Sequence, residues 1–309
     1  MKSINGTIEL TTHRHILTRL SHYDAISYVW ESAPASITVL CNNKPLLITP
    51  TAFEMLQYLY QYQANKFNRK IWIDAICINQ EDPEEKSTQI PLMRDIYSRA
   101  ATVIVWMGPS TPETDVFFAE FQDVVEKSED WIDSWAVDLL IGQPTREELP
   151  CREDAFWDGL LQLLNSEWFR RLWTFQEIIL SRNATLLCGS SWVDFDEFVV
   201  FIKNGFFESN YIPTALRLGN NVNARIAFRA CHRIYSRRKT GVFEPLLPAQ
   251  VAETLNGLRY RNVKEPVDRV WAIAGLLGNH LRDKLALRVD YSAQGREEYW
   301  KTWICLPKF

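Results

Sequence analysis

Residues 71–77 read Ile-Trp-Ile-Asp-Ala-Ile-Cys, an apolar run that predicts a strand buried on both faces. A similar run lies upstream at residues 24–30, and another lies downstream at residues 102–107. Residues 51–60 and 84–99, which separate these runs, have the apolar spacing of helices. Strands that alternate with helices are typical of a parallel sheet with helices on its faces. The sequence therefore predicts an α/β protein.

Two further elements are predicted in the first half, and a mostly helical second half follows. Residues 37–48 read as a hairpin through the Asn-rich turn 41–44, and Pro91 is expected to interrupt the helix at 84–99. The stripe of the helix at 51–60 consists of Ala52, Met55, Leu56, Leu59 and Tyr60. In the second half, helices are predicted at 167–181, 195–202, 224–239 and 267–275, and a short strand at 185–188. We expect a core domain over residues 20–190 and a helical extension over 191–309.

Composition excludes several classes of protein. The 309 residues are 47% hydrophobic and carry a net charge of 34 − 38 = −4, which argues against a dedicated nucleic-acid binder. The sequence contains no run of about 18 apolar residues, so no membrane span is predicted. The N-terminal residues lack the apolar run of a secretory signal. The six cysteines show no C-x-x-C spacing, so we expect reduced thiols, no zinc site and a cytoplasmic location.

Charge is polarised along the chain. Residues 113–158 hold 14 acids and 3 bases, a net −11, whereas residues 203–239 hold 8 bases and 1 acid, a net +7. Within the basic stretch an arginine recurs every fourth residue, at Arg225, Arg229, Arg233 and Arg237, which predicts one basic helix face. This face is either solvated and salt-bridged, or a surface for an anionic phosphate or a partner.

Polar residues follow the predicted strands at their carboxyl ends, where ligands bind in open α/β sheets. Ser27 and Tyr28 close the first strand, and Asp74 leads on to Asn79 and Gln80. Each has a structural alternative. Asp74 can bond loop N–H groups, Asn79 and Gln80 can cap the turn and the next helix, and Ser27 can satisfy loop backbone. No histidine or second acid lies near Ser27 in the sequence to activate its hydroxyl.

Several long motifs resemble one known family. Tyr23-Asp-Ala-Ile-Ser-Tyr-Val-Trp30, Ile71-Trp-Ile-Asp-Ala-Ile-Cys-Ile-Asn-Gln80, Gln89-Ile-Pro-Leu-Met-Arg-Asp-Ile-Tyr-Ser-Arg-Ala100 and Trp168-Phe-Arg-Arg-Leu-Trp-Thr-Phe-Gln-Glu177 resemble the signature blocks of the fungal heterokaryon incompatibility (HET) domain. The resemblance implies a role in nonself recognition and programmed cell death, through self-association or a separate incompatibility or NLR-type partner. Glu31 stands where the first block usually ends in glycine. Many relatives continue beyond the point where this chain stops, so an inactive regulatory remnant is a further alternative.

The HET domain is itself similar to the TIR domain, which implies a TIR/flavodoxin-like parallel sheet and a candidate chemistry. TIR domains that cleave NAD carry a glutamate four residues after a tryptophan, the spacing of Trp173 and Glu177. Residues i and i+4 share a helix face, and a carboxylate there could stabilise the oxocarbenium-like centre left when nicotinamide departs. Alternatively, Glu177 pairs with Arg170 or Arg171.

Glu177 is the candidate catalytic residue, NAD is a candidate substrate, and no cofactor or metal is expected. The candidate ligand-binding residues are Ser27, Tyr28, Asp74, Asn79, Gln80, Arg171 and Trp173.

Overall fold

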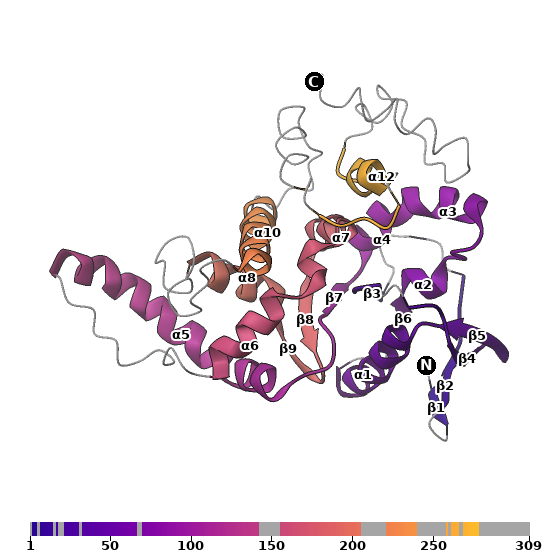
Figure 1. Cartoon of the computed structure of the whole chain (residues 1–309), viewed down its shortest axis with the longest axis horizontal. Helices are drawn as coiled ribbons and strands as arrows, with labels where there is room; N and C mark the ends of the chain where they lie inside the picture. Colours follow the sequence, from indigo (N-terminus) through magenta and orange to yellow (C-terminus); the bar gives the residue numbers. More distant parts are fainter. Residues whose placement is uncertain are drawn as a thin grey trace. The chain divides into compact units, whose positions relative to one another are not determined.

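The computed structural model describes residues 2–4, 7–14, 17, 22–30, 33–66, 70–141, 155–204, 221–239, 258, 261–265 and 268–277. The chain divides into two compact units that interleave along the sequence (Figure 1). The first unit comprises Met1–Trp106, Arg170–Ala184 and Gly241–Phe309, and the second comprises Met107–Phe169 and Thr185–Thr240. The division expected near residue 190 remains a prediction about the family domain, and Glu31 lies outside the described residues.

The first unit contains a parallel sheet. Its strands are β6 (Lys70–Trp72), β3 (Tyr23–Ser27) and β7 (Thr102–Trp106), with β3 between the other two and parallel to both. All five residues of β3 are buried, as the central strand of a covered parallel sheet requires. The α/β class predicted from the sequence is confirmed.

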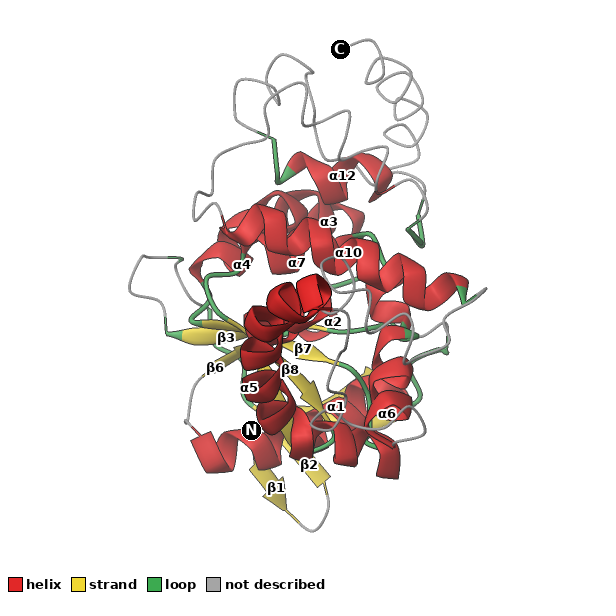
Figure 2. Ribbon diagram, turned by 90° about the vertical axis from the view of Figure 1, so that its left-hand side faces the viewer, coloured by secondary structure: helices red, strands yellow, loops and turns green. Residues whose placement is uncertain are grey.

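Helices cover both faces of this sheet. The helices of the first unit are α1 (Pro50–Lys66), α2 (Asp74–Cys77), α3 (Pro83–Gln89), η1 (Ile90–Leu92), α4 (Met93–Arg99), α7 (Trp173–Leu180) and α12 (Asp268–Ala274). Figure 2 shows α4 and α7 on one side of the strands and α1 on the other. From α4, the Tyr97 hydroxyl donates a hydrogen bond of 2.9 Å to the carbonyl of Ile26. From α1, the Tyr58 ring lies 5.1 Å from the Trp106 ring, centroid to centroid.

A second, four-stranded sheet in the same unit contains the predicted hairpin. Its strands, in spatial order, are β1 (Lys2–Ile4), β2 (Thr7–Leu10), β4 (Ile37–Cys41) and β5 (Lys44–Ile48). Asn42 and Asn43 form the β4–β5 turn with φ values of 51° and 61°, the left-handed conformation that asparagine tolerates best among residues with a side chain. The hairpin prediction is thus confirmed at its turn.

Four predictions about these elements need correction. The strand expected over residues 24–30 begins at Tyr23 and ends at Ser27. The strand expected over residues 71–77 ends at Trp72, because the Asp74 carboxyl accepts the N–H of Ala75 at 2.7 Å and so favours a helical turn over a longer strand. The helix expected over 167–181 is divided into η2 (Glu167–Arg170) and α7. Tyr60, expected in the buried stripe of α1, is 41% exposed. The interruption expected at Pro91 is confirmed, because η1 separates α3 from α4.

The second unit is built on an aromatic core. Its elements are α5 (Pro112–Ile141), α6 (Ala155–Leu164), β8 (Ala184–Cys188), β9 (Ser191–Asp194), α8 (Phe195–Lys203) and α10 (Val222–Lys239), with most of η2. Phe117, on α5, lies 5.0 Å from Phe156 on α6 and 6.2 Å from Phe198 on α8, centroid to centroid. These rings are fully buried, so much of the aromatic content of the chain serves packing here.

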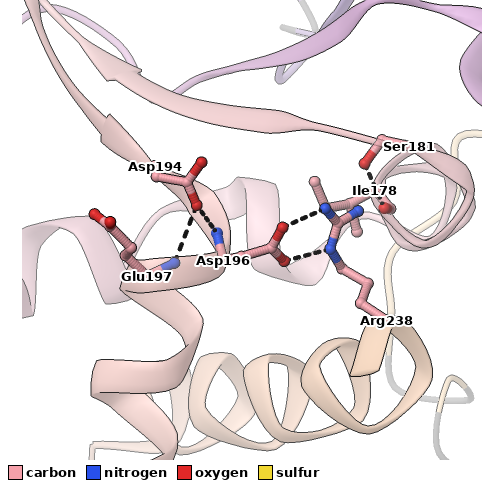
Figure 3. A network of polar contacts seen from close by, with 6 residues as sticks. All are labelled: Ile178, Ser181, Asp194, Asp196, Glu197 and Arg238. Atoms are coloured by element: carbon pink, nitrogen blue, oxygen red, sulfur yellow. Dashed lines mark hydrogen bonds and ion pairs between the residues drawn. The ribbon is translucent and has the colours of Figure 1, made fainter. Parts of the chain in front are cut away.

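Polar contacts fix α8 within this unit (Figure 3). The Asp194 carboxyl caps the helix by accepting the N–H groups of Asp196 and Glu197 at 2.8 and 3.1 Å. Asp196 then forms a two-pronged ion pair with Arg238 of α10, with N···O distances of 2.5 and 2.6 Å. One arginine of the basic stretch is therefore committed to an internal contact.

Gly159 allows α5 and α6 to pack closely, and replacing it is expected to destabilise the second unit. A Cβ at position 159 would lie 2.2 Å from the carbonyl oxygen of Glu113 and 2.9 Å from Cβ of Phe117. We expect Gly159→Ala to lower the free energy of unfolding by about 1–3 kcal/mol, the usual cost of overpacking. Urea unfolding measures it, with Asp158→Ala, an exposed change on the same helix, as control. Equal midpoints for the two variants would contradict the close approach.

Candidate functional site

The central strand β3 delivers a buried hydroxyl to a buried carboxyl. Ser27, its last residue, is fully buried, and its hydroxyl donates a short hydrogen bond to Oε2 of Glu177 on α7. These two residues are 150 positions apart in the chain. The acid that is missing from the sequence around Ser27 is thus supplied by the fold.

Glu177 lies on a helix that is buried almost throughout, and its own exposed fraction is 3%. Burial raises the pKa of Glu177 to about 7, because the ionised form loses its hydration. The Arg171 guanidinium opposes this rise, the Asp74 carboxyl adds to it, and the hydrogen bond from Ser27 opposes it. A carboxyl with a pKa near 7 is present in both forms at neutral pH, so it can give or accept a proton there.

Asp74 lies two residues beyond the carboxyl end of β6, the strand that pairs with β3. Its Oδ1 accepts the N–H of Ala75 at 2.7 Å and the indole Nε1–H of Trp30 at 3.2 Å. Its carbonyl oxygen accepts the Nε2–H of Gln80 at 3.0 Å. Burial raises the pKa of Asp74, while the charge of Arg171 and the hydrogen bonds from Ala75 and Trp30 lower it. The loop N–H contact expected as a structural alternative for Asp74 is present.

Arg171 is the cation of the site. Its Nη1–H donates to the carbonyl oxygen of Tyr28, the residue after β3. Its charge lowers the pKa of both Glu177 and Asp74, so one guanidinium acts on two carboxyl groups that repel each other. The sequence suggested Arg171 as an ion-pair partner of Glu177, whereas in the structure its guanidinium donates a hydrogen bond to the backbone just after β3.

Two buried tyrosines complete the group. Burial raises the pKa of Tyr28 and of Tyr97 well above the usual value, and both hydroxyls feel the charges of Asp74, Glu177 and Arg171. Both phenols therefore stay protonated at neutral pH and remain hydrogen-bond donors.

The structure brings together most of the candidate residues proposed from the sequence. Ser27, Tyr28, Asp74, Arg171 and Glu177 are joined by the contacts described above, and Gln80 reaches the Asp74 backbone. Two candidates lie apart from this network. Asn79 is exposed and its side chain caps a turn by accepting the N–H of Glu81 at 3.2 Å. Trp173 begins α7 one turn before Glu177 and is partly exposed.

Sequence reasoning missed three residues that contact this group: Trp30, Tyr97 and Arg261. Trp30 and Tyr97 lie inside motifs that were singled out as blocks, but nothing in their spacing assigns them a partner. Arg261 donates to the carbonyl of Arg171 at 2.8 Å across a separation of 90 residues. No periodic pattern carries such a long-range contact.

Two kinds of feature are missing from the described part of the chain. It holds no group of three or more His, Cys, Asp or Glu side chains that could bind a metal ion. Nor does any helix within the described ranges have the length and apolarity needed to cross a membrane.

Comparison with known proteins identifies the family. The model of the heterokaryon incompatibility protein (HET) family matches residues 23–177, from the first residue of β3 to Glu177 itself. The chain is also 30% identical, over 317 aligned residues, to heterokaryon incompatibility protein 6, OR allele, of Neurospora crassa; the match covers 87% of this chain and 45% of that relative. No solved structure matches this chain. The chain belongs to the heterokaryon incompatibility (HET) family.

Proposed function

We propose that this chain is an incompatibility effector that acts in fungal nonself recognition in the cytoplasm and triggers programmed cell death. Its family membership and the name of its Neurospora relative support the biological setting. The observation that carries the proposal is the buried Ser27–Glu177 pair at the carboxyl end of the central strand. We infer that effector activity depends on this carboxyl.

The arrangement around Glu177 is costly for a purely structural role. A carboxyl that is 3% exposed loses hydration, and a second carboxyl, Asp74, disfavours its ionisation further. An amide or an apolar residue would avoid that cost. Strongly perturbed titratable groups with specific charged neighbours concentrate at functional sites, which supports a role for the ionisable form.

A second candidate function is NAD glycohydrolysis, and the position of Glu177 favours it. In that reaction the bond between the ribosyl carbon and the nicotinamide nitrogen breaks, and neutral nicotinamide leaves with the bonding electrons. The ionised Glu177 carboxyl would stabilise the positive ribosyl centre. A water oxygen then bonds to that carbon and its proton passes to the carboxylate, giving ADP-ribose. A pKa of about 7 suits both steps near neutral pH.

Expression in a fungal host tests the effector proposal directly. We expect induction of the wild-type chain to reduce colony viability, as an effector of cell death would. Harmless expression at levels confirmed by immunoblot would contradict the proposal and favour the alternative of a regulatory protein without effector activity.

We further propose that the protein self-associates, and that the basic face of α10 contributes to the contact. Arg225 and Arg229 are exposed on this helix, whereas Arg238 is paired with Asp196. The strongly acidic stretch of residues 113–158 offers the opposite charge on a second copy.

Reversing the charge of the basic face is expected to weaken self-association. We expect Arg225→Glu combined with Arg229→Glu to shift the concentration for half-association upward at least tenfold, measured by light scattering after size exclusion. Lys44→Glu combined with Lys70→Glu, two exposed positions in the first unit, makes the same change in net charge and is the control. Wild type that stays monomeric at all concentrations would contradict self-association. Equal effects of the two double variants would contradict the role of α10.

A further inference from the structure

The backbone around Arg171 is held by a segment far away in the sequence. The N–H of Asn262 donates to the carbonyl of Arg170 at 2.5 Å, and the N–H of Leu172 donates to the carbonyl of Asn262 at 3.0 Å. Arg171 and Asn262 thereby form a parallel β-bridge. This bridge occupies the break between η2 and α7, where the sequence predicted an uninterrupted helix.

Arg261, the neighbour of Asn262, adds side-chain contacts to the same few residues. It is 3% exposed, and its Nη1–H groups donate to the carbonyl of Arg171 at 2.8 Å and to Oγ1 of Thr174 at 3.3 Å. Its guanidinium carbon lies 5.2 Å from the centroid of the Phe175 ring, within the range of a cation–π contact. Arginine is seldom buried in this way without a specific role for its fork of donors.

The Thr174 hydroxyl contacts both arginines. This hydroxyl, which receives a hydrogen bond from Arg261, donates one of 2.9 Å to the carbonyl of Arg171. That carbonyl therefore accepts from Arg261 and Thr174 together. Residue 171 is fixed through its carbonyl and through the bridge, which leaves its guanidinium directed to the edge of β3.

We infer that Arg261 is a positioning residue for the Glu177 site: by fixing the backbone of Arg171 and the first turn of α7, it places the Arg171 guanidinium between the carboxyl groups of Glu177 and Asp74. The inference rests on the proposed function only in treating that site as functional. It extends the site beyond the residues that the family model matches, which end at 177.

The consequence is electrostatic and can be measured without an activity assay. Arg171 lowers the pKa of Glu177 and of Asp74. An opposite charge a few ångströms away lowers a carboxyl pKa by about 1–3 units, and the effect fades as the distance grows. Releasing Arg171 from its position should therefore raise the pKa of Glu177 further.

The experiment is a carboxyl titration by carbon-13 NMR on the full chain labelled at glutamate, with the Glu177 signal assigned through Glu177→Gln. We expect Arg261→Met to raise the Glu177 pKa by about one unit. Arg261→Lys keeps the charge and one donor, so a smaller shift in the same direction is expected. Arg94→Met is the matched control, because Arg94 also donates to a backbone carbonyl, that of Gly275, whereas the charge that lowers the pKa of Glu177 is that of Arg171.

The outcomes separate positioning from simple stabilisation. A rise in the Glu177 pKa in the Arg261 variants but not in Arg94→Met supports the inference. An unchanged Glu177 pKa in folded Arg261→Lys and Arg261→Met, with stability lowered as in Arg94→Met, would overturn it. If Arg261→Met does not fold, the Lys variant decides. A shifted pKa in a protein whose killing does not depend on Glu177 would leave the inference standing while the proposed function fails.

Discussion

Glu177→Gln is expected to abolish the effector activity while the protein stays folded. Glutamine has nearly the same shape, and its amide oxygen still accepts the hydrogen bond that Ser27 donates. It neither ionises nor exchanges a proton near pH 7, so the chemistry of the carboxyl is removed selectively. If Glu177 is the catalytic group, the rate of the catalysed reaction should fall by about 10²–10⁴-fold. Colony viability after induced expression measures the effect in cells.

The matched control for this variant is Glu120→Gln, an exposed glutamate on α5 of the second unit. We expect it to kill as the wild type does. The same three proteins, purified and concentrated, are then assayed for NAD consumption. Consumption by the wild type and by Glu120→Gln alone would assign an NAD glycohydrolase centred on Glu177. Killing by Glu177→Gln at the wild-type level would show that the effector activity does not need this carboxyl.

Glu177 is also expected to make the protein less stable as the pH rises from about 4.5 to about 7. The folded-state pKa of about 7 lies above the ordinary value of 4.5, so within this window the folded protein binds more protons than the unfolded chain, and stability falls with pH. At 1.36 kcal/mol per unit of pKa, the penalty above pH 7 amounts to about 3 kcal/mol. Below pH 4.5 both states are protonated and the penalty vanishes.

Urea unfolding of the wild type and of Glu177→Gln, at pH 5 and at pH 8, measures this penalty. The variant should exceed the wild type in stability by about 3 kcal/mol at pH 8 and by much less at pH 5. Comparing the two proteins is necessary because burial also raises the pKa of Asp74, which adds a slope of the same sign to both. Stability differences that are equal at the two pH values would show that Glu177 ionises normally in the folded protein.

The parts of the fold that follow from local pattern were predictable from the sequence. The apolar run at 102–107 gave β7 within one residue of its end, the run at 24–30 gave β3 but extended three residues beyond it, and the Asn42–Asn43 turn gave the hairpin. The errors occurred where side chains or distant segments compete for the backbone. The Asp74 carboxyl ends β6 early, and Asn262 takes the backbone groups of Arg170 and Leu172 that a continuous helix would have used. Periodicity carries no information about either competitor.

The sequence predicted which residues belong to the candidate site, but it did not predict the contacts between them. The rule that ligands bind at the carboxyl ends of parallel strands selected Ser27 and Asp74, and the similarity of the HET domain to the TIR domain selected Glu177. That Ser27 donates to Glu177 could not be read from residues 150 positions apart. The contacts of Arg261 lay further out of reach, because they depend on the packing of a segment that no motif marked.

The β-bridge between Arg171 and Asn262 bears on the order of events during protein synthesis. Ribosomes deliver a chain from its N-terminus at roughly 5–20 residues per second, and contacts between distant residues form late because a long loop must close first. The strand that carries Ser27 emerges early, Glu177 much later, and Asn262 later still. A nascent chain that is cut short before residue 262 lacks the group that holds Arg171 in place. The complete site therefore forms in the cell only after residue 262 has been translated.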